Sequence, residues 1–328
     1  MNHLKAALLL LLAFSTFNFL HVGYNFSTYE YDIDYSEGFV LEDVERLIQN
    51  GKLYVEPKME NGFESVKYPP LYYLMLTGLA KFLGLSFSTG RLISIFFTFA
   101  SLTLIYLISR NKAKLKFNFV PLIFLSTYLT IFTGTTLRTD MIALSFTLLG
   151  LYLFLNKRVF LSSLLLSLSA FTKQSFVSAF LAISFYLFLQ LDLTDTWKDI
   201  SNHRYSKLIQ KNRKFWIFNL SYTIITLSLF SLAYLSSEHF LTNILSANAG
   251  GFEIRWNLIS WLHFTMLPIL SLAFYYLYIF KDRLLGSYMI FSLIIALLQL
   301  LRGGAWIYAM IEPFAVSIIC TAILYGRL

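Results

Sequence analysis

The sequence is poor in charged residues, since only 13% of its 328 residues are Asp, Glu, Lys or Arg, whereas a soluble domain has about 25%. Hydrophobic residues make up 57% and aromatic residues 18%, and the mean hydropathy is +0.64. Nearly every long segment is apolar over the roughly 17 to 25 residues that a bilayer-spanning helix needs. We therefore predict an all-α polytopic membrane protein with a single membrane domain over residues 1–328 and no soluble domain.

The chain also has few of the residues that form disulfides or metal sites. Its single cysteine, Cys320, lies in a late apolar segment, which excludes an intrachain disulfide. Its five histidines are dispersed and lack metal-ligand spacing. We assign no metal site and no certain cofactor, although the acidic residues near the N terminus could hold a divalent cation. The net charge of +8 does not indicate nucleic-acid binding, because the basic residues lie in short clusters between apolar segments.

The acidic residues are concentrated in one hydrophilic stretch. Ten of the eighteen lie between Asn25 and Lys67, together with four basic residues, so the stretch carries a charge of 4 − 10 = −6. Basic clusters follow at 110–116, 157–158, 198–214 and 281–283. By the positive-inside rule the clusters should face the cytoplasm and the loop 25–67 should face outward.

This orientation fixes the role of the first apolar segments. The run from Ala6 to about Val22 is followed by Gly-Tyr-Asn rather than a small-residue cleavage site, so we interpret it as a retained first span. The segment 69–85 opens with two prolines and carries Lys81. We predict that it forms an interfacial helix on the outer face, while 92–109 crosses the membrane. Continuing along the chain, with 118–134 as the next span, gives about ten crossings.

Within the outer loop, apolar residues recur at helical spacing. Phe39, Val40, Val44, Leu47 and Ile48 alternate with acids before Asn50 and Gly51. This pattern predicts an amphipathic helix on the membrane surface that ends near Gly51.

The predicted topology gathers most of the unusual polar residues at or near one face of the membrane. Ionisable groups at such positions are costly and are functional candidates. The residues are Asp34, Glu37, Lys67, Asp140, Lys173, Arg302 and Glu312.

Asp34 and Glu37 are three residues apart, so both carboxylates lie on one face if the surface helix starts here. One could deprotonate a hydroxyl while the other positions it or binds a cation. The alternative is that both are solvated acids of an acidic loop. Asp32 is the expected bystander.

The basic residues suit an anionic ligand. Lys67, held before Tyr68 and two prolines, could bind a lipid phosphate or simply reach the interface as a snorkelling side chain. Lys173 with Gln174 interrupts an apolar stretch at an outer hairpin, which favours ligand contact over turn chemistry. Arg302 precedes two glycines, an arrangement that suits a phosphate; its alternative is a flexible turn.

Two acids lie at the ends of apolar segments. Asp140 should begin a span, where the helix dipole favours a carboxylate; it could serve only as a cap or as an ion-pair partner of Arg138. Glu312 precedes Pro313 within the last apolar segment and needs a partner inside the bundle.

Taken in order, these motifs resemble a known pattern. It comprises Asp34-Tyr-Ser-Glu37-Gly38, Asn50-Gly51-Lys-Leu-Tyr54, Lys67-Tyr68-Pro69-Pro70-Leu71-Tyr72-Tyr73, Gly90-Arg91-Leu92, Arg138-Thr-Asp140-Met, Phe171-Thr-Lys173-Gln174 and Glu312-Pro313. The ordered set resembles GT-C membrane glycosyltransferases, in particular the bacterial and archaeal branch related to protein O-mannosyltransferases and aminoarabinose transferases.

The resemblance implies a GT-C-like bundle with juxtamembrane helices in the first outer loop, which also holds the catalytic acid. It implies a polyprenyl-phosphate-linked sugar as donor, a lipid, glycan or protein as acceptor, and an active site on the outer face of the plasma membrane. Asp34 or Glu37 would be the general base of an inverting transfer. Lys67, Lys173 and Arg302 would neutralise the departing lipid phosphate, and Tyr68, Arg138, Asp140, Gln174 and Glu312 would complete the substrate site.

The sequence departs from this pattern at two points. Relatives commonly have adjacent Asp and Glu, whereas Ser36 precedes Glu37 here, and Tyr308 and Ala309 stand where Asn-Tyr often precedes the Glu-Pro pair. Two other function classes stay open. A transporter or flippase of lipid-linked saccharides should have polar residues near the bilayer midplane and symmetry between halves, and a non-catalytic subunit of a glycan-assembly complex would keep the fold without turnover.

Overall fold

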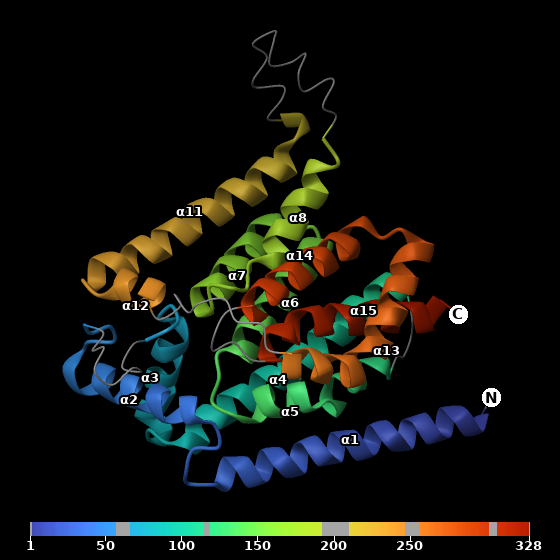
Figure 1. Cartoon of the computed structure of the whole chain (residues 1–328). Coiled ribbons are helices and arrows are strands. Elements are labelled where there is room, and N and C mark those ends of the chain that lie inside the picture. Colours follow the sequence, from blue (N-terminus) through green and yellow to red (C-terminus); the bar gives the residue numbers. More distant parts are fainter. Residues whose placement is uncertain are drawn as a thin grey trace.

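The computed structural model describes residues 2–56, 66–114, 119–191, 210–246, 256–301 and 307–327. Every regular element in these ranges is a helix, as expected for an all-α protein. The helices pack around α15 (Ile311–Arg327), which lies in the middle of the bundle in Figure 1. The span that contains α15 is 94% buried, so its apolar side chains form the centre of the protein core.

The first two helices enclose the start of the outer loop. Helix α1 (Asn2–Thr28) runs along the outside of the bundle, and α2 (Tyr35–Asn50) follows after a short turn (Figure 1). Helix α2 buries Val40 and Val44 and ends at Gly51, which adopts a left-handed conformation with φ of 68°. Such a conformation carries little steric cost for glycine. The predicted helix and its end at Gly51 are therefore confirmed, and its place on the membrane surface stays a prediction.

The segment after the two prolines forms a short helix, α3 (Leu71–Leu83), which follows Pro70. It packs against α2 and against α4 (Phe87–Ala113). With 13 residues, α3 is shorter than the helices that are long enough to cross a bilayer. Its placement along the outer face stays a prediction.

The expected span over 118–134 is broken in two. Its described part consists of the 3-10 helix η2 (Val120–Ser126) and the short helix α5 (Tyr128–Thr135). Pro121 stands in the first turn of η2, and the Thr127 hydroxyl accepts the amide of Thr130 to start a new helix. Helix α6 (Asp140–Leu155) then leaves α5 at an angle of 106°. This bend creates the turn that contains Arg138.

The remaining helices complete the bundle. They are α7 (Val159–Thr172), α8 (Ser178–Phe188), α11 (Arg213–Ser236), α12 (Phe240–Ser246), α13 (Trp256–Phe280), α14 (Arg283–Leu300) and the 3-10 helix η3 (Ile307–Met310). Helix α6 packs against α4 and α7, and α14 packs against α8 and α15.

Five helical segments in the described ranges are long and apolar enough to cross a membrane, or six if the bent pair α5 and α6 counts as one span. Four shorter apolar helices of 10 to 17 residues accompany them. The chain is thus an integral membrane protein, and the expected number of about ten crossings stays a prediction.

The two ends of the bundle differ. Helices α2, α3 and α12 gather at one end, whereas both chain termini lie at the other (Figure 1). Helix α4 starts at the end occupied by α2 and α3, because its first turns pack against both of them. This end, defined here as the α2–α3 end, holds the candidate site.

Candidate active site

Glu37 forms the most buried ion pair at the α2–α3 end. Its carboxylate faces Arg91 on α4, and neither side chain is exposed to solvent. The Arg91 Nε donates to Glu37 Oε1 at 3.0 Å, and a terminal nitrogen donates to Oε2 at 2.7 Å. The amides of Ile33 and Leu137 each donate to the same carboxylate at 2.7 Å. These four donors occupy both oxygens of Glu37.

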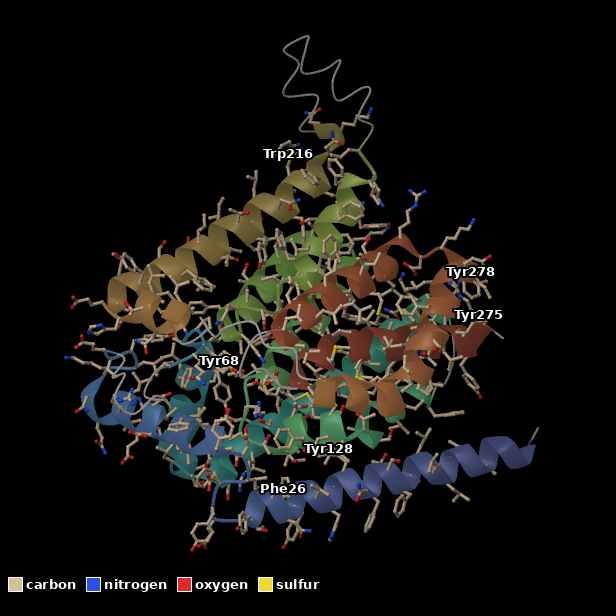
Figure 2. All side chains as sticks on the ribbon, viewed as in Figure 1. Phe26, Tyr68, Tyr128, Trp216, Tyr275 and Tyr278 are labelled. Atoms are coloured by element: carbon tan, nitrogen blue, oxygen red, sulfur yellow. The ribbon has the colours of Figure 1, made fainter. Side chains whose placement is uncertain are left out.

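Arg91 also fixes the turn between α1 and α2. Its two terminal nitrogens donate to the carbonyl oxygens of Phe26, Tyr29 and Tyr31 at 2.6 to 2.7 Å. Phe26 lies at the end of α1 in Figure 2. A planar guanidinium has five donors in a fixed arrangement, and here all of its nitrogens are used. Arg91 therefore holds the segment that leads directly into Asp34.

Asp34 immediately precedes the first turn of α2 and differs from Glu37 in its surroundings. Its Oδ2 forms an ion pair with Arg138 and accepts the hydroxyl of Ser36. About 10% of its side chain is exposed, whereas Glu37 is fully buried. Asp34 is thus the more accessible of the two predicted carboxylates.

Arg138 lies in the turn between α5 and α6. Its guanidinium stands 4.4 Å from the ring centre of Tyr308 and 5.1 Å from that of Phe132. The expected alternative partner, Asp140, forms its ion pair with Lys173. The ion pair of Arg138 is with Asp34 instead. Burial would lower the pKa of Arg138, but the charges of Asp140 and Asp34 outweigh it and raise this pKa.

Asp140 begins α6, as predicted, and pairs with Lys173 at the end of α7. The Lys173 Nζ lies 2.6 Å from Asp140 Oδ1, and the side chains are only 4% and 2% exposed. Burial would lower the pKa of Lys173, but the nearby Asp140 charge outweighs it and raises this pKa. Lys173 is therefore a buried, ion-paired cation rather than a residue of an open hairpin.

Aromatic rings cover this second pair. The Lys173 ammonium lies 4.8 Å from the ring centre of Tyr308, 5.5 Å from that of Tyr68 and 5.8 Å from that of Phe176. Tyr68 lies between the α2–α3 end and the rest of the bundle in Figure 2. Because Tyr308 contacts both Arg138 and Lys173, its ring joins the two ion pairs.

The segment of Lys67 and Tyr68 is held against the hairpin of Lys173. The Gln174 side-chain amide donates to the Lys67 carbonyl oxygen at 3.0 Å, and the Tyr54 hydroxyl donates to the Tyr68 carbonyl oxygen at 2.9 Å. Burial lowers the pKa of the Lys67 ammonium. Partly buried cations near an apolar surface interact strongly with an anion that reaches them.

Several polar atoms of this cluster are buried without a hydrogen-bond partner among the described residues. They are the Nε of Arg138, the hydroxyl of Tyr72, the Oγ1 of Thr139 and the Oε1 of Gln174. Buried polar atoms normally have partners, and an exception calls for an explanation such as a missing ligand. Their presence beside the two ion pairs is consistent with a site that completes its hydrogen bonds on binding a polar substrate.

Glu312 lies apart from these ion pairs, in the first turn of α15. Its Oε1 accepts the Ser178 hydroxyl and, at 2.9 Å, the Tyr288 hydroxyl. The expectation of a partner inside the bundle is confirmed, and both partners found among the described residues are neutral. The predicted residue Arg302 lies outside the described residues.

The structure brings together eight of the ten predicted residues, but it also adds three that were not predicted for the site. The eight are Asp34, Glu37, Lys67, Tyr68, Arg138, Asp140, Lys173 and Gln174. The additions are Arg91, Tyr72 and Tyr308. Arg91 could have been predicted from the sequence, because a cation inside a long apolar segment is unusual. Tyr72 and Tyr308 could not, because the chain has 21 tyrosines and nothing in the sequence distinguishes these two. No three His, Cys, Asp or Glu side chains in the described ranges are grouped to hold a metal ion.

The similarity of this chain to known proteins was found in its fold and not in its sequence. No protein-family model matches the sequence, and no curated protein matches it. The crystal structure of ArnT from Cupriavidus metallidurans in the apo state superposes with a TM-score of 0.64 and 14% sequence identity. The match covers 99% of this chain and 60% of that one, so the chain spans about 60% of the length of ArnT. ArnT has the GT-C polytopic membrane fold, and the present chain shares this fold.

Proposed function

We propose that the protein is a membrane glycosyltransferase that moves a sugar from a polyprenyl-phosphate-linked donor to an acceptor hydroxyl on the outer face of the plasma membrane. The reaction would be inverting. A base takes the proton of the acceptor hydroxyl, the acceptor oxygen forms a bond to the anomeric carbon, and the bond from that carbon to the phosphate oxygen breaks. The polyprenyl phosphate leaves with the bonding electrons. The fold shared with ArnT supports the enzyme class.

We assign the general base to Asp34 rather than Glu37. A general base must come within hydrogen-bond reach of the proton that it removes. Both oxygens of Glu37 already accept hydrogen bonds, five in all, from Arg91 and from the amides of Ile33, Asp34 and Leu137, and the side chain is fully buried. Asp34 is partly exposed, and its hydrogen bonds to side chains involve only Oδ2. Glu37 instead acts with Arg91 as a positioning pair that holds the turn before Asp34.

Arg138, Lys173 and Lys67 would bind the phosphate of the donor. Arg138 and Lys173 pair with Asp34 and Asp140, and the half-buried Lys67 is held against the hairpin of Lys173. The Nε of Arg138 is buried without a partner among the described residues and could donate to a phosphate oxygen. Preorganised cations of this kind stabilise negative charge that develops on a leaving group. Asp140 and Tyr308 hold Lys173 in place. Roles for Gln174, Glu312 and Arg302 in substrate binding rest on the resemblance described above.

One observation carries this assignment. The partly exposed carboxylate of Asp34 forms an ion pair with Arg138, and the Nε of Arg138 is buried without a hydrogen-bond partner among the described residues. Asp34 and Arg138 are 104 residues apart in the sequence and form an ion pair in the fold. This contact supports a base beside a side chain that binds phosphate. A transferase needs both groups at one reacting centre.

The test is sugar transfer by the purified chain from a panel of radiolabelled polyprenyl-phosphate sugars. Asp34→Asn should lower the rate by at least about 100-fold, the usual contribution of general-base catalysis, while donor binding persists. Asp32→Asn is the matched control, because Asp32 is exposed and lies two residues away. It should transfer at the wild-type rate.

The other function classes are outcomes of the same test. Transport of a lipid-linked saccharide without transfer would support a transporter or flippase. Donor binding without either activity, unchanged in Asp34→Asn, would support a non-catalytic subunit. Transfer that survives in Asp34→Asn but disappears in folded Glu37→Gln would contradict the assignment of the base.

A further inference from the structure

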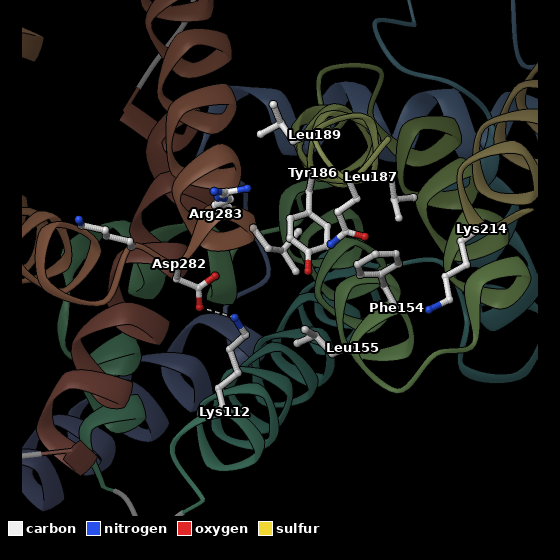
Figure 3. Close-up of a pocket in the computed structure, with 12 residues that line it drawn as sticks. Lys112, Phe154, Leu155, Tyr186, Leu187, Leu189, Lys214, Asp282 and Arg283 are labelled. Atoms are coloured by element: carbon white, nitrogen blue, oxygen red, sulfur yellow. Dashed lines mark hydrogen bonds and ion pairs between the residues drawn. The ribbon is translucent and has the colours of Figure 1, made fainter. Parts of the chain in front are cut away.

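A second polar region lies at the other end of the bundle. It is a cavity of about 650 Å³ formed where α4, α6, α8 and α11 meet the connection between α13 and α14. Figure 3 shows Lys112, Asp282 and Arg283 on one side of it and Lys214 on the other, with Tyr186 between them. A cavity of this size lies within the usual range of ligand sites, about 300 to 1,000 Å³.

The distance between the cavity and the candidate active site is about the thickness of the hydrocarbon core of a bilayer. Helix α4 carries Arg91 near its start and Lys112 near its end. Twenty-one residues at the α-helical rise of 1.5 Å separate the two by about 30 Å, and the hydrocarbon core of a bilayer is also about 30 Å thick. If Arg91 lies at one membrane surface, Lys112 therefore lies at the headgroup level of the opposite leaflet.

The charges that line the cavity are unbalanced. Lys112, Lys214, Lys281 and Arg283 face one carboxylate, Asp282. That carboxylate is already occupied, because it pairs with Lys112 and accepts the Tyr276 hydroxyl and the Leu285 amide, each at 3.1 Å. Lys214, Lys281 and Arg283 form no ion pair within the described ranges. Among the described residues, three positive charges are thus left for a ligand.

The cavity wall is apolar on its deeper side. Leu187 and Leu284 are buried, and Phe154 and Leu155 are half-buried. The Tyr186 hydroxyl points toward the middle of the cavity (Figure 3). A ligand that fits this arrangement has a negatively charged head and an attached apolar part, which describes an anionic phospholipid better than a small soluble anion.

We propose that this cavity binds the phosphate headgroup of an anionic phospholipid from the leaflet opposite the candidate active site. Lys214, Lys281 and Arg283 supply positive charge around the headgroup, and the apolar wall contacts the first methylenes of the acyl chains. Basic pockets between membrane helices on the cytoplasmic side are known to take such headgroups. The site is separate from the proposed transferase centre and does not depend on its activity.

The test is a thermal-shift titration of the purified full chain with dihexanoyl phosphatidylglycerol, dihexanoyl phosphatidylcholine and inorganic phosphate. Phosphatidylglycerol should stabilise the wild type at lower concentration than phosphatidylcholine does. The double variant Lys214→Gln/Arg283→Gln should bind phosphatidylglycerol about 30-fold more weakly, because each cation near a membrane surface strengthens binding about fivefold. The matched control is Lys157→Gln/Arg158→Gln, which removes the same charge from exposed residues outside the cavity.

A further variant tests the cavity without changing the charge. Gln190 is exposed and lines it, so Gln190→Trp should fill the space and also weaken the binding of phosphatidylglycerol. Equal loss in the cavity and control double variants would overturn the proposal, because only the net charge would then matter. Inorganic phosphate that binds as tightly as phosphatidylglycerol would also overturn it and would identify a soluble phosphate as the ligand.

Discussion

Glu37 and Arg91 are 54 residues apart in the sequence and form a two-contact ion pair in which neither side chain is exposed. The pair connects α2 to α4. The same guanidinium donates its other N–H groups to the carbonyl oxygens of Phe26 at the end of α1 and of Tyr29 and Tyr31 in the following turn. The position of Asp34, at the end of this turn, thus depends on a residue that itself takes no part in the proposed chemistry.

Arg91→Met should destabilise the protein strongly. Removing one partner of a buried ion pair leaves an uncompensated charge and costs about 3 to 5 kcal/mol. We expect a large decrease in the thermal unfolding temperature in detergent, with little rescue in Arg91→Lys, because an ammonium cannot reproduce the arrangement of guanidinium donors. Glu30→Gln, which alters an exposed acid of the same turn, should leave the unfolding temperature unchanged. Wild-type stability in Arg91→Met would refute a structural role for this pair.

Variants of the Asp140–Lys173 pair should show separate effects on stability and on sugar transfer. Lys173→Met alone should destabilise the chain, because Asp140 would stay buried without its cation. Adding Asp140→Asn should restore most of the stability, since replacing both members of a buried pair by neutral groups is often tolerated. The double variant should nevertheless lack sugar transfer. Unfolding temperatures and transfer rates of the three variants provide the measurement, and full activity in the double variant would exclude a role for Lys173 at the phosphate.

Asp43 on α2 should make stability depend on pH. Burial raises the pKa of its carboxyl to about 7, although Arg46 lies 3.0 Å away and opposes the shift. In the unfolded chain the carboxyl titrates near its ordinary value of 3.8. Folding therefore binds a proton between these pH values, and stability should decrease as the pH rises from about 4 to about 7, by on the order of 4 kcal/mol.

Asp43→Asn should remove this pH dependence, because its amide cannot ionise. The measurement is the unfolding temperature of both proteins between pH 4 and pH 8. Glu45→Gln, which alters an exposed acid on the same helix, should keep the wild-type profile. The same slope in Asp43→Asn and the wild type would mean that another group is responsible.

Tyr308 should act through its ring rather than through its hydroxyl. The ring lies 4.4 Å from the Arg138 guanidinium and 4.8 Å from the Lys173 ammonium, and a buried cation–π contact contributes about 0.5 to 2 kcal/mol. Tyr308→Phe should keep most of the transfer activity, whereas Tyr308→Leu should reduce kcat/KM by about 10-fold or more. An equal loss in both variants would instead assign the effect to the hydroxyl.

Local sequence patterns were sufficient to predict that this is a membrane protein, that it is helical, and where several helices end. Hydropathy depends on runs of neighbouring residues, and the glycine at position 51 ends α2 because its left-handed conformation is a property of that single residue. The gathering of Asp34, Lys67, Asp140 and Lys173 at one end also followed from the positions of the basic clusters, because each apolar span carries the chain from one face to the other.

The partners of these residues were decided only by the tertiary structure. The sequence suggested Arg138 as a partner for Asp140, but packing places it against Asp34, 104 residues away, and pairs Asp140 with Lys173. The break over 118–134 and the 106° bend before α6 likewise depend on what surrounds them. Asp34 and Glu37 look alike in the sequence, and only the folding of α4 against α2 buries one and leaves the other accessible. Burial and pairing of a charge are set by side chains distant in sequence, because desolvation depends on every group that excludes water from that charge.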